Sequence, residues 1–410
     1  MKRNTLSLAA SLAVSLLLPA LGAHAQSAAT DADLAQKVDK LSAELAALKA
    51  QVQASPAAAP AEPATVLTSY GEINYNRPTK KPENAQADVR RFVLGFQHRF
   101  DDKTKVVTEL EVEHGVSSAD DAGEVEVEQA FIEHQLMPGT ALRAGLFLMP
   151  VGLLNENHEP TAFYGVERNF VETAIIPSTW REGGLQYVGN FDNGLTVQAG
   201  LSTTFDLSKW DATSTEGAES PLAAVHQEMS LAKARDVAVF GAANWRGIPG
   251  LLLGGSLFTS NATQGQAGFP SARITLWDLH ARWTPQRWDL SALYTQGHIS
   301  NTAELNAPLE GSATLIPERF EGWYVQTAYT AWTSGDQALS PFARYERYNT
   351  ASRYADLGAG LTPDALPTER VYTVGANYKL NANVVVKVDL QRFKENKDNN
   401  RFDLGLGWSF

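Results

Sequence analysis

The chain ends in the stretch RFDLGLGWSF, residues 401–410, in which apolar side chains alternate with small or polar ones. Its Phe, Leu and Trp residues share one face of an extended strand, and its Asp, Gly and Ser residues share the other. A strand that lies between lipid and a water-filled lumen requires this pattern, because one face meets acyl chains and the other meets water. The terminal stretch therefore predicts a transmembrane β-strand.

The same period of two recurs upstream. Segments 368–380 and 383–394 repeat it, with Val385 as the one exception, and segments 88–100 and 104–116 alternate apolar residues with Arg, Gln and Glu. A soluble β-sandwich also alternates, but its polar faces rarely hold so many Arg and Glu residues beside aromatic residues at strand ends. The repetition favours a membrane barrel over a sandwich.

A count of these segments gives sixteen, and an even number is what a single-chain bacterial barrel needs. Tight turns alternate with long connections, which predicts that the short turns and both termini lie in the periplasm. The predicted fold class is all-β, a transmembrane antiparallel β-barrel of about 16 strands preceded by a short N-terminal coiled-coil helix. The segments are 65–76, 88–100, 104–116, 124–137, 140–150, 182–191, 194–205, 235–246, 250–260, 272–283, 287–299, 319–331, 339–349, 368–380, 383–394 and 401–410.

Segment 124–137 fits the alternation least well. Its glutamates, up to Glu128, share a parity with the apolar Ile132, so one regular strand would place both kinds of side chain on the same face. A β-bulge inserts one extra residue and shifts the parity of everything that follows. We therefore predict a bulge near Ala130.

The N-terminus has the features of a secretory signal peptide. A positive pair, Lys2 and Arg3, precedes an apolar core over residues 6–18 and an Ala-His-Ala motif that ends at Ala25. The core is too short for a membrane anchor, and Pro and Gly residues interrupt its end. We predict a signal peptide over residues 1–25, which implies that the mature protein works outside the inner membrane.

A heptad pattern follows the signal peptide. Six apolar residues recur at alternating spacings of four and three, which places them on one helical seam and predicts a periplasmic coiled-coil helix over residues 26–53. An amphipathic helix lying on the protein's own surface is the alternative. Residues 54–64 form a Pro/Ala linker with extended character. The seam residues, which are the candidates for trimerisation, are Leu34, Val38, Leu41, Leu45, Leu48 and Val52.

Composition excludes several functional classes. The 410 residues include no Cys, which excludes disulfides, thiolate metal sites and a Cys nucleophile. With 34 basic and 46 acidic residues, the formal net charge is −12 and Lys and Arg do not cluster, so nucleic-acid binding is not expected. Apart from the N-terminus, no apolar run is long enough to predict a membrane-spanning helix.

Several motifs resemble those of a known family. The chain's end is similar to the terminal aromatic signal that the barrel assembly machinery reads, with Trp408 and Phe410 as its carriers. Over about residues 65–410 the sequence resembles the porins grouped with the phosphate-selective porins O and P. The other motifs that carry the resemblance are Gly145-Leu146-Phe147 leading to Pro150-Val151-Gly152, Phe342-Ala343-Arg344-Tyr345-Glu346 and Asn383-Val384-Val385-Val386-Lys387.

The resemblance implies a homotrimer in the outer membrane, in contact with the lipid bilayer and lipopolysaccharide, whose third external loop folds inward and narrows the pore. Here that loop is 151–181. Its acidic excess does not make an obvious phosphate site, because phosphate capture calls for convergent Arg and Lys. Its candidate constriction residues are Glu156, His158, Glu159, Glu167, Arg168, Glu172 and Arg181.

Strand parity also predicts which charges line the pore wall. Basic and acidic residues both fall on inward positions, so parity alone leaves anion or cation selectivity open. Simple solvation of a wet wall, with no selective role, is the alternative for each of them. The candidates are Arg91, Arg99, Glu109, Glu111, Glu113, Arg143, Asp278, Arg282, Arg344, Glu346, Lys387 and Asp389, with Glu72 among the opposing acids.

Other chemistry has little support in the sequence. The eight His residues are scattered, and none has the close spacing of a local metal site, so neither a metal nor a cofactor is expected. Asp278 and His280 share a strand face and form a possible carboxylate–imidazole pair. No nucleophile motif accompanies them, and we do not expect an enzyme.

Two functional hypotheses follow. The first is a porin that forms a water-filled channel for passive diffusion of small hydrophilic solutes and ions, including anions such as phosphate. The second is a structural or adhesive barrel with a plugged lumen and a coiled coil that tethers the envelope. Inward-facing glycines such as Gly95, Gly145 and Gly375 leave room inside and favour the channel. A soluble periplasmic sandwich is a third reading.

Overall fold

The structure is a computed structural model that describes residues 31–54 and 63–410. The chain divides into two compact units, residues 1–63 and 64–410. The predicted signal peptide and all but the ends of the predicted linker lie outside the described residues.

The first unit contains one described helix, α2 (Asp31–Ala54). Three residues of the predicted seam, Val38, Leu41 and Leu45, are each more than half exposed in the single chain. A row of exposed Val and Leu on one face of a helix is an apolar surface that another helix can cover. No described helix is both long and apolar enough to span a bilayer.

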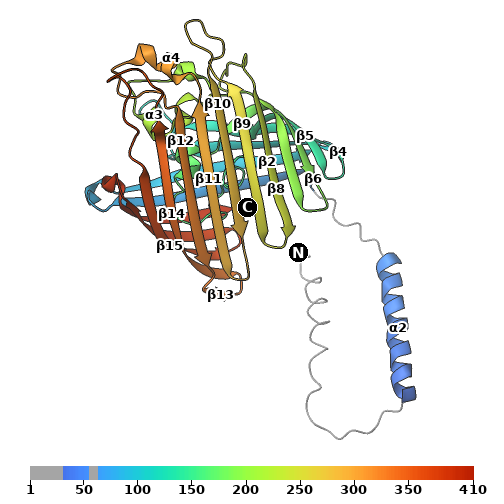
Figure 1. The fold of residues 1–410 in the computed structure, drawn as a ribbon. Helices are drawn as coiled ribbons and strands as arrows, with labels where there is room; N and C mark the ends of the chain where they lie inside the picture. Colours follow the sequence, from blue (N-terminus) through green and yellow to red (C-terminus); the bar gives the residue numbers. More distant parts are fainter. Residues whose placement is uncertain (1–30, 55–62) are drawn as a thin grey trace. The chain divides into compact units, whose positions relative to one another are not determined.

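The second unit is a closed antiparallel β-barrel, which confirms the predicted fold class (Figure 1). The short β13 and the preceding β12 both pair with β14, so the seventeen strand labels describe sixteen barrel strands. The strands are β1 (Thr65–Pro78), β2 (Gln86–Arg99), β3 (Thr104–Glu113), β4 (Val125–Met137), β5 (Thr140–Leu148), β6 (Arg181–Asn190), β7 (Leu195–Ser202), β8 (Ala238–Ile248), β9 (Leu251–Asn261), β10 (Arg273–Trp283), β11 (Trp288–Ile299), β12 (Arg319–Tyr329), β13 (Trp332–Ser334), β14 (Gln337–Arg353), β15 (Glu369–Asn381), β16 (Val384–Phe393) and β17 (Arg401–Ser409).

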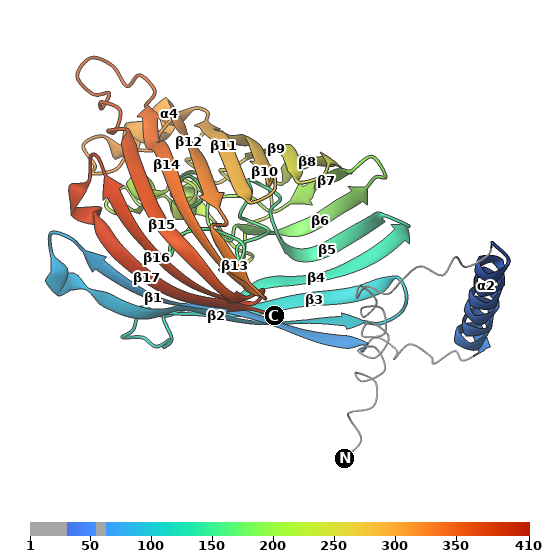
Figure 2. The same cartoon turned by 90° about the horizontal axis from the view of Figure 1, so that it is seen from below.

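The barrel closes between its first and last strands, where β1 pairs with both β2 and β17 (Figure 2). On β17 the predicted alternation holds. Leu404 and Leu406 are 42% and 40% exposed, whereas Asp403 between β1 and β16 is fully buried. Apolar side chains therefore face outward, and the polar ones face the interior, as a barrel in lipid requires.

The short connections are tight turns at one end of the barrel. Gly139 and Gly194 have φ of +76° and +83°, a left-handed conformation that glycine adopts without strain. In the turn between β2 and β3, the amides of Lys103 and Thr104 each donate to Asp101 Oδ1 at 2.8 Å, which lowers the pKa of that carboxyl. These turns define the short-turn end, and the opposite end is the long-loop end.

The structure confirms the predicted irregularity in β4. Glu109 pairs with Gln129 and the next residue, Leu110, pairs with Val127, so Glu128 is the extra residue of a β-bulge. The bulge lies two residues from the predicted Ala130. Because it shifts the parity, successive side chains of β4 at 128 and 129 both point into the lumen.

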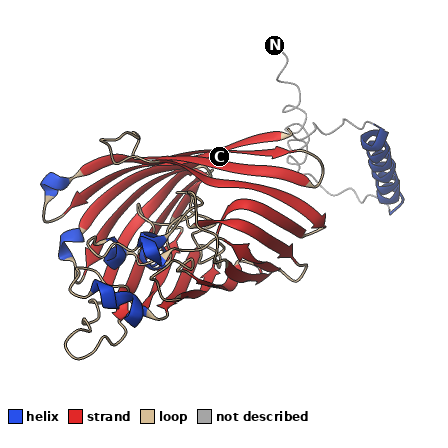
Figure 3. Cartoon of the chain, turned by 90° about the horizontal axis from the view of Figure 1, so that it is seen from above, coloured by secondary structure: helices blue, strands red, loops and turns tan. Residues whose placement is uncertain are grey.

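Loops occupy part of the barrel interior, as Figure 3 shows. The residues between β5 and β6 and those between β7 and β8 pack against inward side chains of neighbouring strands in one apolar cluster. Its largest member, Trp180, lies 4.7 Å from Phe258 and 5.1 Å from Phe205 between ring centroids. Short helical turns lie in these and other loops, among them a π-turn (Val171–Ile175), α3 (Glu216–Glu219) and α4 (Thr302–Asn306).

Candidate functional site

The connection between β5 and β6, residues 149–180, lies inside the barrel and is attached to its wall. We call it the interior loop. Its backbone amides donate to wall carboxylates: Val166 N to Asp389 Oδ2 at 2.6 Å, and Phe170 N to Glu346 Oε1 at 2.5 Å. These acceptors stand on β16 and β14, far around the barrel from β5 and β6. The loop therefore crosses the lumen, as the family resemblance implies for its third external loop.

Side chains of the wall also donate to the interior loop or contact its rings. Arg344 Nη1 donates to the carbonyl oxygen of Tyr164 at 3.0 Å, and Asn377 Nδ2 donates to that of Phe163 at 3.0 Å. The ammonium of Lys387 lies 3.5 Å from the centre of the Phe163 ring. Some of the charges predicted to line the wall are thus partners of the loop, and each of them is buried.

Glu172 ties the interior loop to itself and to the wall. Its Oε1 accepts from the amides of Leu153 at 2.6 Å and Leu154 at 2.8 Å, and its Oε2 accepts from Asn169 Nδ2 at 2.8 Å and Tyr324 Oη at 2.9 Å. Four donors satisfy one buried carboxylate, so the predicted constriction residue Glu172 is a structural centre of the loop.

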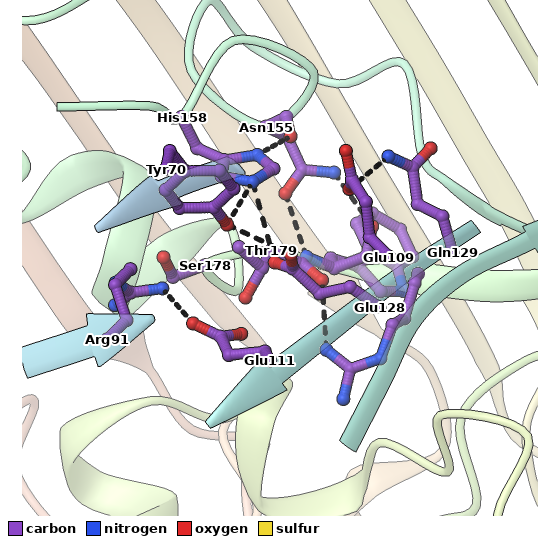
Figure 4. A network of polar contacts seen from close by, with 12 residues as sticks. Tyr70, Arg91, Glu109, Glu111, Glu128, Gln129, Asn155, His158, Ser178 and Thr179 are labelled. Atoms are coloured by element: carbon purple, nitrogen blue, oxygen red, sulfur yellow. Dashed lines mark hydrogen bonds and ion pairs between the residues drawn. The ribbon is translucent and has the colours of Figure 1, made fainter. Parts of the chain in front are cut away.

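A second attachment joins the loop to β1 and β4 (Figure 4). His158 Nδ1 lies 2.9 Å from the Asn155 carbonyl oxygen, and its Nε2 lies 2.7 Å from Tyr70 Oη. The Tyr70 hydroxyl donates to Glu128 Oε2 at 2.9 Å. All three side chains are buried, and Glu128 reaches this position through the bulge in β4.

Arg91 on β2 lies among three carboxylates. Its Nε is 3.1 Å from Glu72, its Nη1 is 3.0 Å from Glu111 and its Nη2 is 3.3 Å from Glu113. The structure therefore brings together three predicted wall residues with Glu72, and it does so with the arginine side chain 7% exposed. A guanidinium with five donors suits this surplus of acceptors.

A cavity of about 450 Å³ lies on the long-loop side of the interior loop, and we call it the long-loop chamber. Some of its charges form ion pairs. Arg181 forms ion pairs with Glu126 and, at 3.0 Å, with Glu228. Its charged lining residues are Glu72, Arg90, Arg91, Glu113, Glu124, Glu126, Glu167, Arg168, Arg181, His226, Glu228 and Arg401.

A second cavity, of about 340 Å³, lies on the short-turn side and has a different lining. We call it the short-turn chamber. Three arginines line it, Arg246, Arg282 and Arg344, and no Asp or Glu is among the described residues that do. Arg282 forms two hydrogen bonds to Asp289, at 3.0 and 2.6 Å. The rest of the lining is apolar or neutral, including Leu153, Leu154, Phe163, Tyr164, Ile248 and Gln326.

Two groups of the short-turn chamber carry unused donors. Within residues 31–54 and 63–410, no hydrogen bond or ion pair involves the Arg246 guanidinium, and Arg344 Nη2 is buried without a hydrogen-bond partner. A buried donor without an acceptor is costly, so Arg344 Nη2 favours a ligand that supplies an oxygen atom, and the exposed Arg246 offers further donors beside it.

The remaining predicted residues lie toward the short-turn end or on the loop's edge. Arg143 donates to Glu133 at 2.8 Å and lies 4.0 Å from Glu156. Arg99 is exposed beside the turn that follows β2, and Glu159 is half-buried on the interior loop. Whether these charges act on passing ions stays a prediction.

The predicted carboxylate–imidazole pair is present. His280 Nδ1 lies 2.5 Å from Asp278 Oδ1, and Asp278 also accepts from the Gly152 amide at 3.2 Å and from the Ser256 hydroxyl. Ser256 contacts the carboxylate and has no hydrogen bond to the imidazole among the described side chains. Because Asp278 lies between the serine and the histidine, the imidazole cannot take the proton of Ser256, and a serine nucleophile needs its base in direct contact.

Strand parity alone did not single out three residues of these sites. Tyr70 lies on the inward face of β1 beside Glu72, and Arg246 lies on the inward face of β8 two positions after Asn244. Both could have been found by extending the inward parity to the strand ends. Glu128 could not, because its direction depends on the exact position of the bulge.

Comparisons with known proteins agree on the fold. No protein-family model matches the chain. A protein of Aquifex aeolicus (strain VF5), described only as uncharacterized, is 28% identical over 365 residues, which cover 84% of this chain and 79% of that protein.

Two solved structures are similar in fold. OmpF of Salmonella typhi, in a complex with daunomycin, has a TM-score of 0.59 at 14% identity, and the match covers 84% of this chain and 97% of that one. The outer-membrane channel DcaP of Acinetobacter baumannii has a TM-score of 0.54 at 14% identity, with the same coverage. The resemblance to the phosphate-selective porins stays a prediction, and what the comparisons show is that this chain has the sixteen-stranded barrel fold of the outer-membrane porins.

Proposed function

We propose that the protein is an outer-membrane porin, a channel for passive diffusion of small hydrophilic solutes with a preference for small anions. The observation that carries this proposal is a closed barrel with an apolar exterior and two polar-lined chambers on either side of an interior loop. In the outer membrane, the short-turn end would face the periplasm, and the outward side chains would contact the lipid bilayer and lipopolysaccharide.

The preference for anions rests on the short-turn chamber. Three arginines line it. Arg282 pairs with Asp289 and Arg344 pairs with Glu346, whereas the Arg246 guanidinium forms no hydrogen bond or ion pair with a described residue. Fixed charge in a narrow, low-dielectric passage concentrates counter-ions, so this chamber favours anions although the whole chain is acidic. Phosphate is one anion whose oxygens such a set of donors would bind.

We also propose that the mature protein is a homotrimer. The exposed Val and Leu residues of α2 support this, since a coiled coil would bury them between copies. A coiled coil of about three heptads is short, so contacts between barrels would contribute to assembly. Insertion would use the barrel assembly machinery through the terminal aromatic residues Trp408 and Phe410.

Planar-bilayer conductance of the purified protein tests the channel. We expect conductance steps in groups of three and a reversal potential on the anion side across a KCl gradient. Block by added phosphate would support a phosphate-binding chamber. A folded, heat-modifiable protein that gave no conductance would contradict the proposal and favour the alternative of a structural barrel with a plugged lumen.

A further inference from the structure

Three potential metal ligands meet where the interior loop touches the wall. They are Glu109 on β3, Glu128 on β4 and His158 on the loop, and one donor atom from each lies within 4.8 Å of the other two (Figure 4). Sequence spacing could not reveal this group, because the three residues come from three different elements.

The imidazole is oriented for coordination. His158 Nδ1 donates to the Asn155 carbonyl oxygen at 2.9 Å, which directs Nε2 toward the two carboxylates. Histidines that bind metal ions commonly donate their second ring N–H to a backbone carbonyl or a carboxylate in this way. The contact that anchors the loop therefore also presents the nitrogen that a metal ion would use.

The carboxylates are also positioned for a ligand. Glu128 is fully buried, and its Oε1 accepts no hydrogen bond from any described residue. That oxygen lies 3.5 Å from His158 Nε2, close to the roughly 3.4 Å that separates two ligands of a tetrahedral ion with bonds of about 2.0–2.1 Å. Gln129 donates a hydrogen bond to Glu109, the third of the three side chains, and fixes the position of its carboxylate.

The charge of the group also calls for a cation. Two carboxylates and one imidazole share a small volume, and the nearby Arg91 already pairs with three other glutamates. Glu128 accepts a hydrogen bond from Tyr70, and Glu109 accepts one from Gln129, so the only cationic partner within reach of Glu128 among the described residues is the His158 imidazole. A divalent ion would offset both carboxylate charges at once.

We propose that Glu109, Glu128 and His158 bind a divalent transition-metal ion that clamps the interior loop to the barrel wall. One imidazole with two carboxylates suits an ion such as Zn²⁺, whereas Ca²⁺ and Mg²⁺ prefer oxygen ligands alone. Tyr70 Oη lies 2.7 Å from His158 Nε2 and must give up this contact when Nε2 coordinates the ion, whereas its hydrogen bond to Glu128 Oε2 can remain. Binding of the ion requires a folded barrel with the interior loop in place, but it does not require that the barrel conducts ions.

Zn²⁺ titration of the tag-free mature protein in detergent, against a chromophoric chelator, tests the site. We expect one ion per chain, and we expect His158→Gln and Glu109→Gln each to weaken binding at least about tenfold. His226→Gln is the matched control, because His226 contacts Glu228 at 3.1 Å in a different cluster, and it should leave the affinity unchanged.

Heat-modifiable migration checks that each variant is folded. Glu109→Gln preserves shape and leaves the contact between His158 and Tyr70 intact, so it keeps the test valid if the His158 variant fails to fold. The absorption spectrum of the Co²⁺ form should show tetrahedral bands that both variants lose. No binding by the wild type, or equal binding by all folded variants, would overturn the proposal.

Discussion

The two chambers lie on opposite sides of one loop, yet they use charge in opposite ways. In the long-loop chamber, Arg91 and Arg181 form ion pairs with glutamates, Arg91 with three of them and Arg181 with two. In the short-turn chamber, Arg246 has no protein partner among the described residues, and no carboxylate lines the cavity. Net charge does not reveal this difference, because the chain as a whole carries −12.

The comparison teaches that pairing, more than the number of charges, decides what a charge can do. A buried and fully paired arginine is part of the scaffold, and its field is largely cancelled at a distance. A solvated and unpaired arginine acts on ions in the lumen. Mutations in the two chambers should therefore affect different properties, stability in one and selectivity in the other.

The largest effect is expected from Arg91→Gln in the long-loop chamber. The substitution removes the arginine partner of the buried Glu72 and Glu111 and of the partly exposed Glu113, which should lower the free energy of unfolding by about 3–5 kcal/mol. Urea unfolding in detergent micelles, followed by tryptophan fluorescence, measures it. Arg246→Gln is the control and should change stability by less than about 0.5 kcal/mol. Equal losses in both variants would remove the distinction between the chambers.

An intermediate effect is expected from Arg246→Glu in the short-turn chamber. One unit charge acts on an ion about 4 Å away with roughly 1 kcal/mol in water, and the substitution changes the local charge by two units. Salt in the lumen screens this interaction, so we expect a smaller change than the unscreened energy gives. The ratio of Cl⁻ to K⁺ permeability, measured as the reversal potential across a KCl gradient, should fall roughly three- to tenfold. The same reversal in the long-loop chamber, Arg90→Glu, should alter the ratio less than about twofold, and a larger change there would contradict the assignment.

The smallest effect is expected when a paired charge is removed together with its partner. Arg282→Gln combined with Asp289→Asn deletes both members of an ion pair and leaves the local net charge unchanged. The permeability ratio should therefore stay within about 1.5-fold of the wild type in the same bilayer recording, because the field of a close pair is weak beyond the Debye length. A fall as large as that of Arg246→Glu would show that pairing does not cancel the charge of Arg282.

Strand positions were predictable because lipid imposes a simple rule. A membrane on one side and water on the other force a period of two, and β17 therefore lies where the alternation of residues 401–410 places it. The bulge in β4 was predictable for the same reason, since it is the point at which the parity breaks.

The path of the interior loop was not predictable from its residues, because a loop has no period. Only the family resemblance implied that it folds inward. Parity placed Lys387 and Asp389 inside the barrel, but it carried no information about what covers them. Their contacts with Phe163 and Val166 depend on how a distant segment packs, which is a property of the whole fold.

The seam between β1 and β17 also sets an order of events. An open sheet presents unpaired backbone groups at its edges, and this barrel loses its edges only when its last strand pairs with its first. The Thr161 hydroxyl of the interior loop bonds that of Ser409 at 2.7 Å, and further partners of the loop stand on β14 and β16. The contacts of the interior loop with β14, β16 and β17 therefore cannot all form until the last strands of the chain have been made.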